Sequence, residues 1–255
     1  MPGLFDLEGK RALVTGGSRG IGRAIATALA DAGADVAITS RKGDDAEPVA
    51  GAIRAKGRRS LALLLEVRNA NSIRVCFERL DREWGSVDIL VNNAGTNVAQ
   101  DLATLDETSW DTVVDTDLKG LVFVTQAATP RMIAASRGGR IINIASIYGV
   151  VGRRERVSYS AAKAGVVNVT RSLALELAPH GITVNAIGPS LAETDLTRDR
   201  MRRNPAFREE EVARTPLGRL AAPEDVAAAA VFFASPAASF ITGQTLMVDG
   251  GTSAH

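Results

Sequence analysis

Short apolar runs alternate with longer amphipathic segments along the whole chain. Most runs are continuously apolar, which is typical of strands that are buried on both faces of a parallel sheet. The expected strands are Arg11–Thr15, Asp35–Ser40, Ser60–Leu65, Asp88–Val91, Arg140–Ala145, Ile182–Ile187 and Thr245–Val248. The segments between them have apolar residues at helical spacing, and the expected helices cover residues 20–33, 44–57, 70–84, 107–136, 157–179 and 223–234.

Repetition of strand and helix predicts right-handed crossovers, and therefore a single-domain α/β fold over residues 1–255. We expect a Rossmann-type, doubly wound parallel sheet of about seven strands. Glycines suited to left-handed C-terminal caps follow four of the helical segments, namely Gly33, Gly57, Gly85 and Gly181. Ligands bind such sheets at the carboxyl ends of the strands. The chemistry is therefore expected just after Thr15, Ser40, Val91, Ala145 and Ile187.

Composition fits an ordinary globular protein, with 45% hydrophobic and 23% charged residues among 255. The formal net charge of +1 provides no general attraction for nucleic acid or an anionic membrane. The N-terminal segment has no secretory pattern, and no apolar run is long enough for a transmembrane helix. We therefore expect a cytoplasmic protein with neither a nucleic-acid nor a membrane partner.

The residues that usually bind metals are scarce. Cys76 is the single cysteine, and the two histidines, His180 and His255, belong to no Cys/His cluster. No metal site is expected. Cys76 lies in a helical pattern and is interpreted as a small core residue rather than a reactive thiol.

A glycine-rich turn joins the first strand to the first helix, with the sequence Thr15-Gly16-Gly17-Ser18-Arg19-Gly20-Ile21-Gly22. Glycines let the backbone turn tightly and approach a pyrophosphate closely. The helix N-terminus adds free N–H groups and the positive end of a dipole. The turn predicts a dinucleotide site, and a glycine-rich turn without a ligand is the alternative.

Tyr159 and Lys163 are four residues apart in a helical segment, so they share one face. Reduction of a ketone leaves an alkoxide-like oxygen that must receive a proton. A phenol with an ordinary pKa of about 10 can supply it, and a nearby ammonium favours the phenolate and pulls the pKa toward working pH. The pair predicts an acid/base centre.

Several motifs in register resemble those of the short-chain dehydrogenase/reductase family. After the T-G-x-x-x-G-x-G turn come Asn92-Asn93-Ala94-Gly95, Ser146, Tyr159-Ser160-Ala161-Ala162-Lys163, Asn185 before Pro189, and Val248-Asp249-Gly250-Gly251. The resemblance implies a seven-stranded sheet and, usually, a homotetramer. It gives Tyr159 the proton transfer, and Lys163 the tuning of its pKa and a bond to the nicotinamide ribose. Ser146, thirteen residues before Tyr159, would hydrogen-bond the substrate oxygen.

Asp117 is a departure from the family pattern. It stands where the family normally has an asparagine that positions a water between the lysine and solvent. An ionised aspartate accepts hydrogen bonds but cannot donate them, and it adds negative charge near Lys163. Three interpretations stay open: a working relay with altered pH dependence, a weakened enzyme, or a structural aspartate outside the relay.

The residues after the second strand favour NADP(H) over NAD(H). An NAD site has a carboxylate there for the ribose 2′-hydroxyl. Here the chain reads Ser40-Arg41-Lys42. Arg41, together with Arg19 from the glycine turn, can bind a 2′-phosphate, and Ser40 can donate to it. The alternative is that Arg41 and Lys42 are only a solvated strand end.

Other cofactor contacts follow from the resemblance. Glu66 replaces the usual aspartate, which meets the adenine amino group, and Pro189 and Thr194 would meet the carboxamide end. The complete expected set is Gly16, Ser18, Arg19, Gly20, Ile21, Gly22, Ser40, Arg41, Glu66, Val67, Asn93, Ala94, Gly95, Tyr159, Lys163, Pro189 and Thr194.

Residues 190–215 are polar and weakly patterned, and we expect them to form a substrate lid. Their arginines, Arg198, Arg200, Arg202 and Arg203, are interpreted as a solvated helix face rather than an anion site. Arg153 and Arg154 either face the substrate or the solvent. The small residues Ala161, Ala164, Gly165 and Ala174 suit subunit contacts or packing within the chain.

The sequence thus predicts an NADP(H)-dependent oxidoreductase with a small carbonyl or alcohol substrate. The chain resembles 3-oxoacyl-carrier-protein reductases and gluconate- or sugar-type dehydrogenases about equally, and a hydrophobic ketone is also possible. The alternative is an NADP(H)-binding sensor or structural subunit with weak or no turnover.

Overall fold

The computed structural model describes residues 3–254, except for the side chains of Asp195, Leu196 and Arg200. His255 and the Arg200 side chain, both named above, lie outside the described parts. Seven strands form one parallel sheet in the order β3-β2-β1-β4-β5-β6-β7. The strands are β1 (Arg11–Val14), β2 (Asp35–Ser40), β3 (Ser60–Leu64), β4 (Ile89–Asn92), β5 (Gly139–Ile144), β6 (Ile182–Pro189) and β7 (Thr245–Val248). The predicted Rossmann-type doubly wound fold is confirmed.

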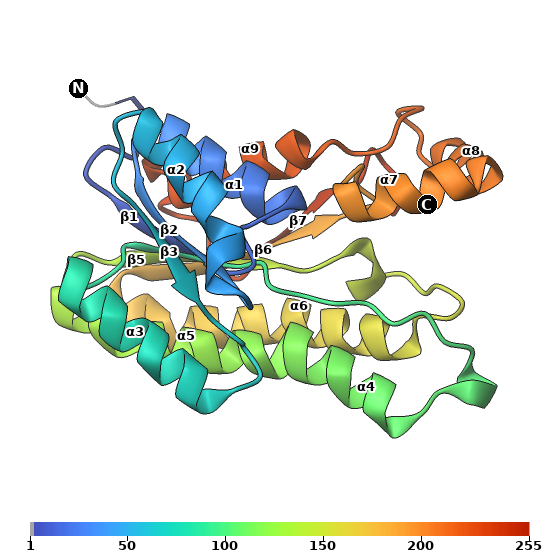
Figure 1. Ribbon diagram of the computed structural model, residues 1–255, viewed down its shortest axis with the longest axis horizontal. Helices are drawn as coiled ribbons and strands as arrows, with labels where there is room; N and C mark the ends of the chain where they lie inside the picture. Colours follow the sequence, from blue (N-terminus) through green and yellow to red (C-terminus); the bar gives the residue numbers. More distant parts are fainter. Residues whose placement is uncertain (1–2, 255) are drawn as a thin grey trace.

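Helices cover both faces of the sheet (Figure 1). One face carries α1 (Gly20–Asp31), α2 (Glu47–Ala55) and α9 (Pro223–Ala234), and the other carries α3 (Ala70–Trp84), α5 (Gly120–Ala135) and α6 (Val157–Leu177). Three more helices lie toward one end of the molecule: α4 (Glu107–Val114), α7 (Asp195–Arg203) and α8 (Pro205–Ala213).

Successive residues of the inner strands belong to different cores, which explains why their sequences are apolar without alternation. In β1, Val14 packs against the α1 and α9 side while Leu13 packs against the α3 and α5 side. In β4, Val91 likewise packs on the α1 and α9 side and Leu90 on the α3 and α5 side. All four side chains are fully buried. Burial of both sheet faces therefore fixes the register of each strand.

Two local predictions are confirmed, namely the left-handed glycines after helices and the core position of Cys76. The four glycines expected after helices, Gly33, Gly57, Gly85 and Gly181, all have positive φ. Cys76 is buried, and burial raises the pKa of its thiol to about 12, as suits a core residue. Within residues 3–254, no helix is long and apolar enough to cross a membrane, and no group of three His, Cys, Asp or Glu side chains could hold a metal ion.

Two regions differ from the expected elements. The single helix predicted over 107–136 is α4 followed by a π-helical segment, Asp115–Lys119, and then α5. Residues 190–215, read as weakly patterned, contain α7 and α8. The helix face expected for the arginines belongs to α7, whereas α8 was not expected, because the many charged residues in this region obscure an apolar stripe.

The proposed subunit face on α6 is wrong at two positions. Ala174 is buried in the core between the sheet and helices α3, α5 and α6. A Cβ on Gly165 would lie 2.7 Å from Leu118, so Gly165 serves close packing against the π-helical segment. Ala161 and Ala164 are exposed. At Gly165 and Ala174, therefore, the alternative of packing within the chain holds.

Candidate active site

The glycine turn after β1 lies against the segment that follows β4. The backbone N–H groups of Asn93 and Ala94 each donate to Thr15 Oγ1 at 2.9 Å. Asn93 Nδ2 donates to the carbonyls of Thr15 and Gly16, at 2.9 and 3.0 Å. These bonds join the predicted cofactor residues of two neighbouring strands at the carboxyl edge of the sheet.

The turn is too tight for larger residues at two of its glycines. Gly16 has a φ of +62°, and a Cβ there would lie 3.0 Å from Ala94 Cα. A Cβ on Gly22 would lie 2.4 Å from both Asn93 Nδ2 and the Gly16 carbonyl. Glycines therefore allow the tight turn that brings backbone N–H groups to the start of α1, as a pyrophosphate site requires.

The N-terminus of α1 is suited to an anion. Arg19 is its N-cap residue and makes no side-chain cap bond, and the first turn contains no acidic residue. Arg19 is exposed, while Ser18 and Ile21 are half-buried in the same turn. The peptide N–H groups and the helix dipole therefore favour negative charge at this point.

The end of β2 places Arg41 on the surface near Glu66, which follows β3. Burial opposes ionisation of Glu66, but hydrogen bonds from Arg68 and the charge of Arg41 outweigh it and lower the pKa of Glu66. Arg68 donates to both carboxylate oxygens of Glu66, from Nε at 3.3 Å and from a terminal nitrogen at 3.4 Å. Ser40 is buried and donates to the carbonyl of Lys42. Sequence reasoning missed Arg68.

The segment after β6 returns to the glycine turn. Pro189 is the last residue of β6, and a Cβ on Gly20 would lie 3.3 Å from Thr194 Cγ2. The Thr194 hydroxyl is 3.2 Å from that of Thr197. Thr194 and the start of α1 are therefore direct neighbours, although they are far apart in sequence.

Ser146, Tyr159 and Lys163 converge at the end of β5. Ser146 follows the strand, is buried, and hydrogen-bonds the phenol of Tyr159. Lys163 Nζ donates to the Ile144 carbonyl at 2.9 Å and lies 5.5 Å from the centre of the Tyr159 ring. The structure thus brings together the three side chains that the sequence placed in one acid/base centre.

Asp117 points into this cluster from the π-helical segment. Its side chain is buried, and Oδ2 lies 3.0 Å from Lys163 Nζ. Oδ1 accepts a hydrogen bond from the backbone N–H of Thr96 at 2.7 Å. Burial raises the pKa of Asp117, although Lys163 and Thr96 oppose that effect. For Lys163, burial is the largest influence and opposes the ammonium, but the charges of Asp117 and Tyr159 and the hydrogen bond to Asp117 together outweigh it and raise the pKa.

The electrostatics of Tyr159 differ from the sequence prediction. Lys163 does lower the pKa of the phenol, as expected, and so does the bond with Ser146. Burial is the largest influence, however, and Asp117 acts in the same direction. The net pKa of Tyr159 is therefore raised, because the prediction considered the ammonium without the desolvation and the carboxylate behind it.

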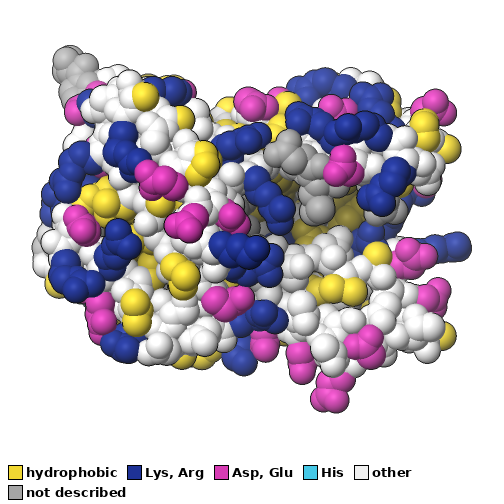
Figure 2. All heavy atoms as spheres, viewed as in Figure 1, with side chains coloured by type: hydrophobic (Ala, Val, Ile, Leu, Met, Phe, Trp, Pro, Cys, Tyr) yellow, Lys and Arg dark blue, Asp and Glu magenta, His cyan; other side chains and the backbone are white. Residues whose placement is uncertain are grey.

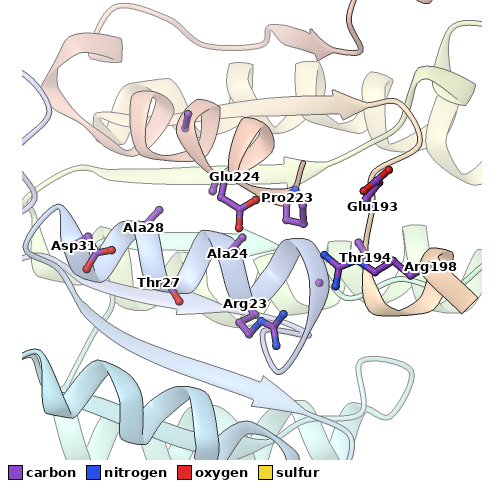
Figure 3. Close-up of a pocket in the computed structure, with 13 residues that line it drawn as sticks. Arg23, Ala24, Thr27, Ala28, Asp31, Glu193, Thr194, Arg198, Pro223 and Glu224 are labelled. Carbon is purple, nitrogen blue, oxygen red and sulfur yellow. The ribbon is translucent and has the colours of Figure 1, made fainter. Parts of the chain in front are cut away.

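A hollow on the face shown in Figure 2 lies between the part that carries α7 and α8 and the part that carries α4, with hydrophobic atoms at its bottom and basic groups along its rim. A separate cavity of about 390 Å³ runs along α1, from Gly20 to Asp31, beside the starts of α7 and α9. In Figure 3, Arg198 reaches from α7 toward the start of α1, beside Thr194. Ser146, Tyr159 and Lys163 do not line that cavity.

The arginines that the sequence placed near the substrate or on a solvated helix face differ in their exposure. Arg153 is half-buried, with a terminal nitrogen 2.6 Å from Glu211 Oε1 in α8, whereas Arg154 is exposed. Arg202 and Arg203 are exposed, in agreement with a solvated helix face, whereas Arg198, although exposed, lines the cavity beside α1.

Tyr148 is a further residue that the sequence analysis missed. Its ring packs edge-on against Tyr159, with the centroids 6.3 Å apart and the planes at 74°. The chain has only two tyrosines, and Tyr148 follows Ser146 by two positions, which is a signal that could have been used. The contact between Arg153 and Glu211 had no such signal, since 58 residues separate them.

Comparison with known proteins agrees with the fold and the site. The family model described as enoyl-(acyl carrier protein) reductase matches residues 16–253. A 3-oxoacyl-acyl-carrier-protein reductase from Staphylococcus aureus is 42% identical over 243 residues, which cover 95% of this chain and 97% of that protein.

Solved structures give the same result. A gluconate 5-dehydrogenase from Burkholderia cenocepacia, in complex with NADP and tartrate, superposes with a TM-score of 0.94 at 35% identity, covering 99% of this chain and 98% of that one. A short-chain type dehydrogenase/reductase from Mycobacterium marinum has a TM-score of 0.93 at 35% identity, with the same coverage. The fold and the site define a dinucleotide-dependent oxidoreductase. The chain belongs to the short-chain dehydrogenase/reductase family.

Proposed function

We propose that this protein is an NADP(H)-dependent oxidoreductase that interconverts a ketone and a secondary alcohol, with Tyr159 as the general acid and base. The observation that carries the proposal is the convergence of Ser146, Tyr159 and Lys163 beside the glycine turn, at the carboxyl edge of the sheet. Ligands of open α/β sheets bind at this edge.

The chain has the features needed to hold the dinucleotide. The glycine turn and the N-terminus of α1 accept the pyrophosphate, because Gly16 and Gly22 let the turn pack closely against Asn93 and Ala94 and the helix presents its free N–H groups. Arg19 and Arg41 are exposed cations at the positions where a 2′-phosphate is recognised. The similar gluconate 5-dehydrogenase is in complex with NADP. When bound, the nicotinamide supplies the hydride for reduction or accepts it in oxidation.

Tyr159 supplies the proton in the same reaction. In reduction its phenol gives a proton to the oxygen that becomes the alcohol, and in oxidation its phenolate removes that proton. Ser146 holds the substrate oxygen by a hydrogen bond. Lys163 stabilises the phenolate, and Asp117 keeps the lysine protonated through their 3.0 Å contact. That contact supports a role for Asp117 in the acid/base centre rather than a purely structural one.

The substrate, the lid and the assembly are parts of the same proposal. A 3-oxoacyl thioester or a sugar-type ketone agrees with the two groups of relatives. Helices α7 and α8, within residues 190–215, border the hollow and form the lid. A homotetramer and a cytoplasmic location remain expectations from the resemblance and the sequence.

Oxidation of NADPH, followed by absorbance with a panel of carbonyl compounds, tests the function. We expect turnover with at least one compound and a loss of about 100-fold or more in Tyr159→Phe, which removes only the acidic hydroxyl. The exposed substitution Arg154→Met is the control and should keep the wild-type rate. NADPH binding without oxidation of any compound would favour the sensor or structural subunit instead.

A further inference from the structure

The wall of the site beside Tyr159 contains a charged pair that the proton transfer does not use. Tyr148 packs against Tyr159, and Arg153 hydrogen-bonds Tyr148. Arg153 also pairs with Glu211 at 2.6 Å. The three side chains thus connect the acid/base centre to helix α8, which the proposed function makes part of the lid.

The pair is sheltered from solvent. The exposed fractions of the side chains are 24% for Arg153 and 10% for Glu211. Ion pairs on an open surface hold their geometry loosely, but an enclosed pair keeps its remaining donors and acceptors at fixed places. A guanidinium has five N–H donors, and a carboxylate accepts several bonds. Arg153 and Glu211 therefore keep donors and acceptors beyond their shared bond, and Tyr148 joins the pair to the acid/base centre.

These groups impose a requirement on the substrate. An apolar chain laid against them would remove their water without supplying hydrogen bonds, which is unfavourable. A chain with hydroxyl groups can accept from Arg153 and donate to Glu211. A carboxylate has no such advantage, because Glu211 repels it while Arg153 attracts it.

We infer that Tyr148, Arg153 and Glu211 determine specificity by binding hydroxyl groups along the substrate's carbon chain. The preferred substrate is then a short, uncharged, hydroxylated ketone or the corresponding polyol, rather than an alkyl ketone or an acyl thioester. This inference rests on the proposed function and narrows its substrate class.

Steady-state kinetics with two ketones of the same carbon skeleton provide the test. L-erythrulose is a four-carbon ketone with three hydroxyl groups, and 2-butanone has none. S-acetoacetyl-N-acetylcysteamine represents the 3-oxoacyl thioesters, and 5-keto-D-gluconate represents the keto acids. For the wild type we expect kcat/KM to be higher for L-erythrulose than for 2-butanone by at least about 100-fold, and higher than for the other two compounds.

Variants separate recognition from folding. Arg153→Met should lower kcat/KM for L-erythrulose by about 10- to 100-fold, chiefly through KM, and leave 2-butanone and the KM for NADPH unchanged. Because that variant leaves Glu211 with only its 4.0 Å contact to Arg214, the double variant Arg153→Met/Glu211→Met is compared with it, as it removes both charges of the pair together. The exposed neighbour substitution Arg154→Met is the control and should behave as the wild type.

The outcomes are distinguishable. An equal fall for both four-carbon ketones in the single and double variants would mean that the pair is only structural, and would overturn the inference. A wild type that favours 2-butanone, the thioester or the keto acid would also overturn it, while the proposed function stands. If no carbonyl compound oxidises NADPH although NADPH quenches tryptophan fluorescence, the proposed function fails, and the inference fails with it.

Discussion

Lys163 Nζ lies 3.0 Å from Asp117 Oδ2, and both side chains are buried. The contact joins α6 to the π-helical segment before α5. A neutral side chain at residue 117 could hydrogen-bond the ammonium, but it could not hold the positive charge in the same way. The identity of residue 117 therefore affects the protonation of both Lys163 and Tyr159.

Asp117→Asn should move the pH profile toward acid. The carboxylate raises the pKa of Tyr159 and of Lys163, so its removal lowers both. Alcohol oxidation needs the phenolate, so its rising limb should shift to lower pH. Ketone reduction needs the phenol, and it should be lost at lower pH than in the wild type.

Rates measured from pH 5 to pH 11 in both directions check this prediction. Asp111→Asn makes the same substitution at an exposed position of α4 and serves as the control for general effects on this helix. A profile that is identical in wild type and Asp117→Asn would remove Asp117 from the acid/base centre. Thermal unfolding at each pH would show that the comparison is made on folded protein.

Arg41→Asp should change the choice of cofactor. Arg41 is exposed at the end of β2, where a carboxylate would repel a 2′-phosphate and accept from a ribose 2′-hydroxyl. We expect the KM for NADPH to rise by at least about 10-fold, and the KM for NADH to change little or fall. Arg79→Asp makes the same change in charge on the exposed side of α3 and should alter neither value. Equal effects of Arg41→Asp on both cofactors would contradict the 2′-phosphate site.

Gly22→Ala should weaken dinucleotide binding. A Cβ there would lie 2.4 Å from Asn93 Nδ2 and from the Gly16 carbonyl, so the turn must shift. We expect the Kd for NADPH to rise by about 10-fold or more and the free energy of unfolding to fall by about 1–3 kcal/mol. Gly57→Ala is the control, because its positive φ strains the backbone but nothing lies within 4 Å. If Gly22→Ala binds NADPH as tightly as Gly57→Ala, the turn is not the cradle.

A buried polar network beneath β4 and β5 should contribute to stability. Asn92 Nδ2 donates to Asn143 Oδ1, and Asn143 Nδ2 donates to Thr170 Oγ1, each at 2.9 Å. Asn143→Ala leaves both partners without these bonds, and we expect the free energy of unfolding to fall by about 2–4 kcal/mol. Urea unfolding gives this value, and the exposed Asn71→Ala should change it by less than about 0.5 kcal/mol. A loss in Asn143→Ala no larger than that of the control would contradict the role of the network.

The sheet and the acid/base cluster could be predicted because their determinants are local. Burial on both faces makes a strand such as β1 continuously apolar, and the carboxyl ends of parallel strands share one edge, so Thr15 and Ser146 were expected there. The contact between Lys163 and Asp117 followed only from the resemblance, since spacing alone does not bring two helices together.

Other features depend on tertiary contacts that leave no pattern. The pairing of Arg153 with Glu211 joins distant segments, and Thr96 meets Asp117 through its backbone, which any residue possesses. The direction of the Tyr159 pKa was predicted wrongly, because burial acts through the whole surrounding volume rather than through one neighbour.

The π-helical segment also sets the direction in which the Asp117 side chain points from the helix axis. One residue of an α-helix corresponds to about 100° of rotation. Insertion or deletion of a single residue therefore rotates the preceding part of the helix about its axis by that angle. The segment Asp115–Lys119 contains one such wide turn between α4 and α5. Loss of one residue there would turn α4 relative to α5 and carry the carboxylate away from Lys163 without changing a single catalytic side chain.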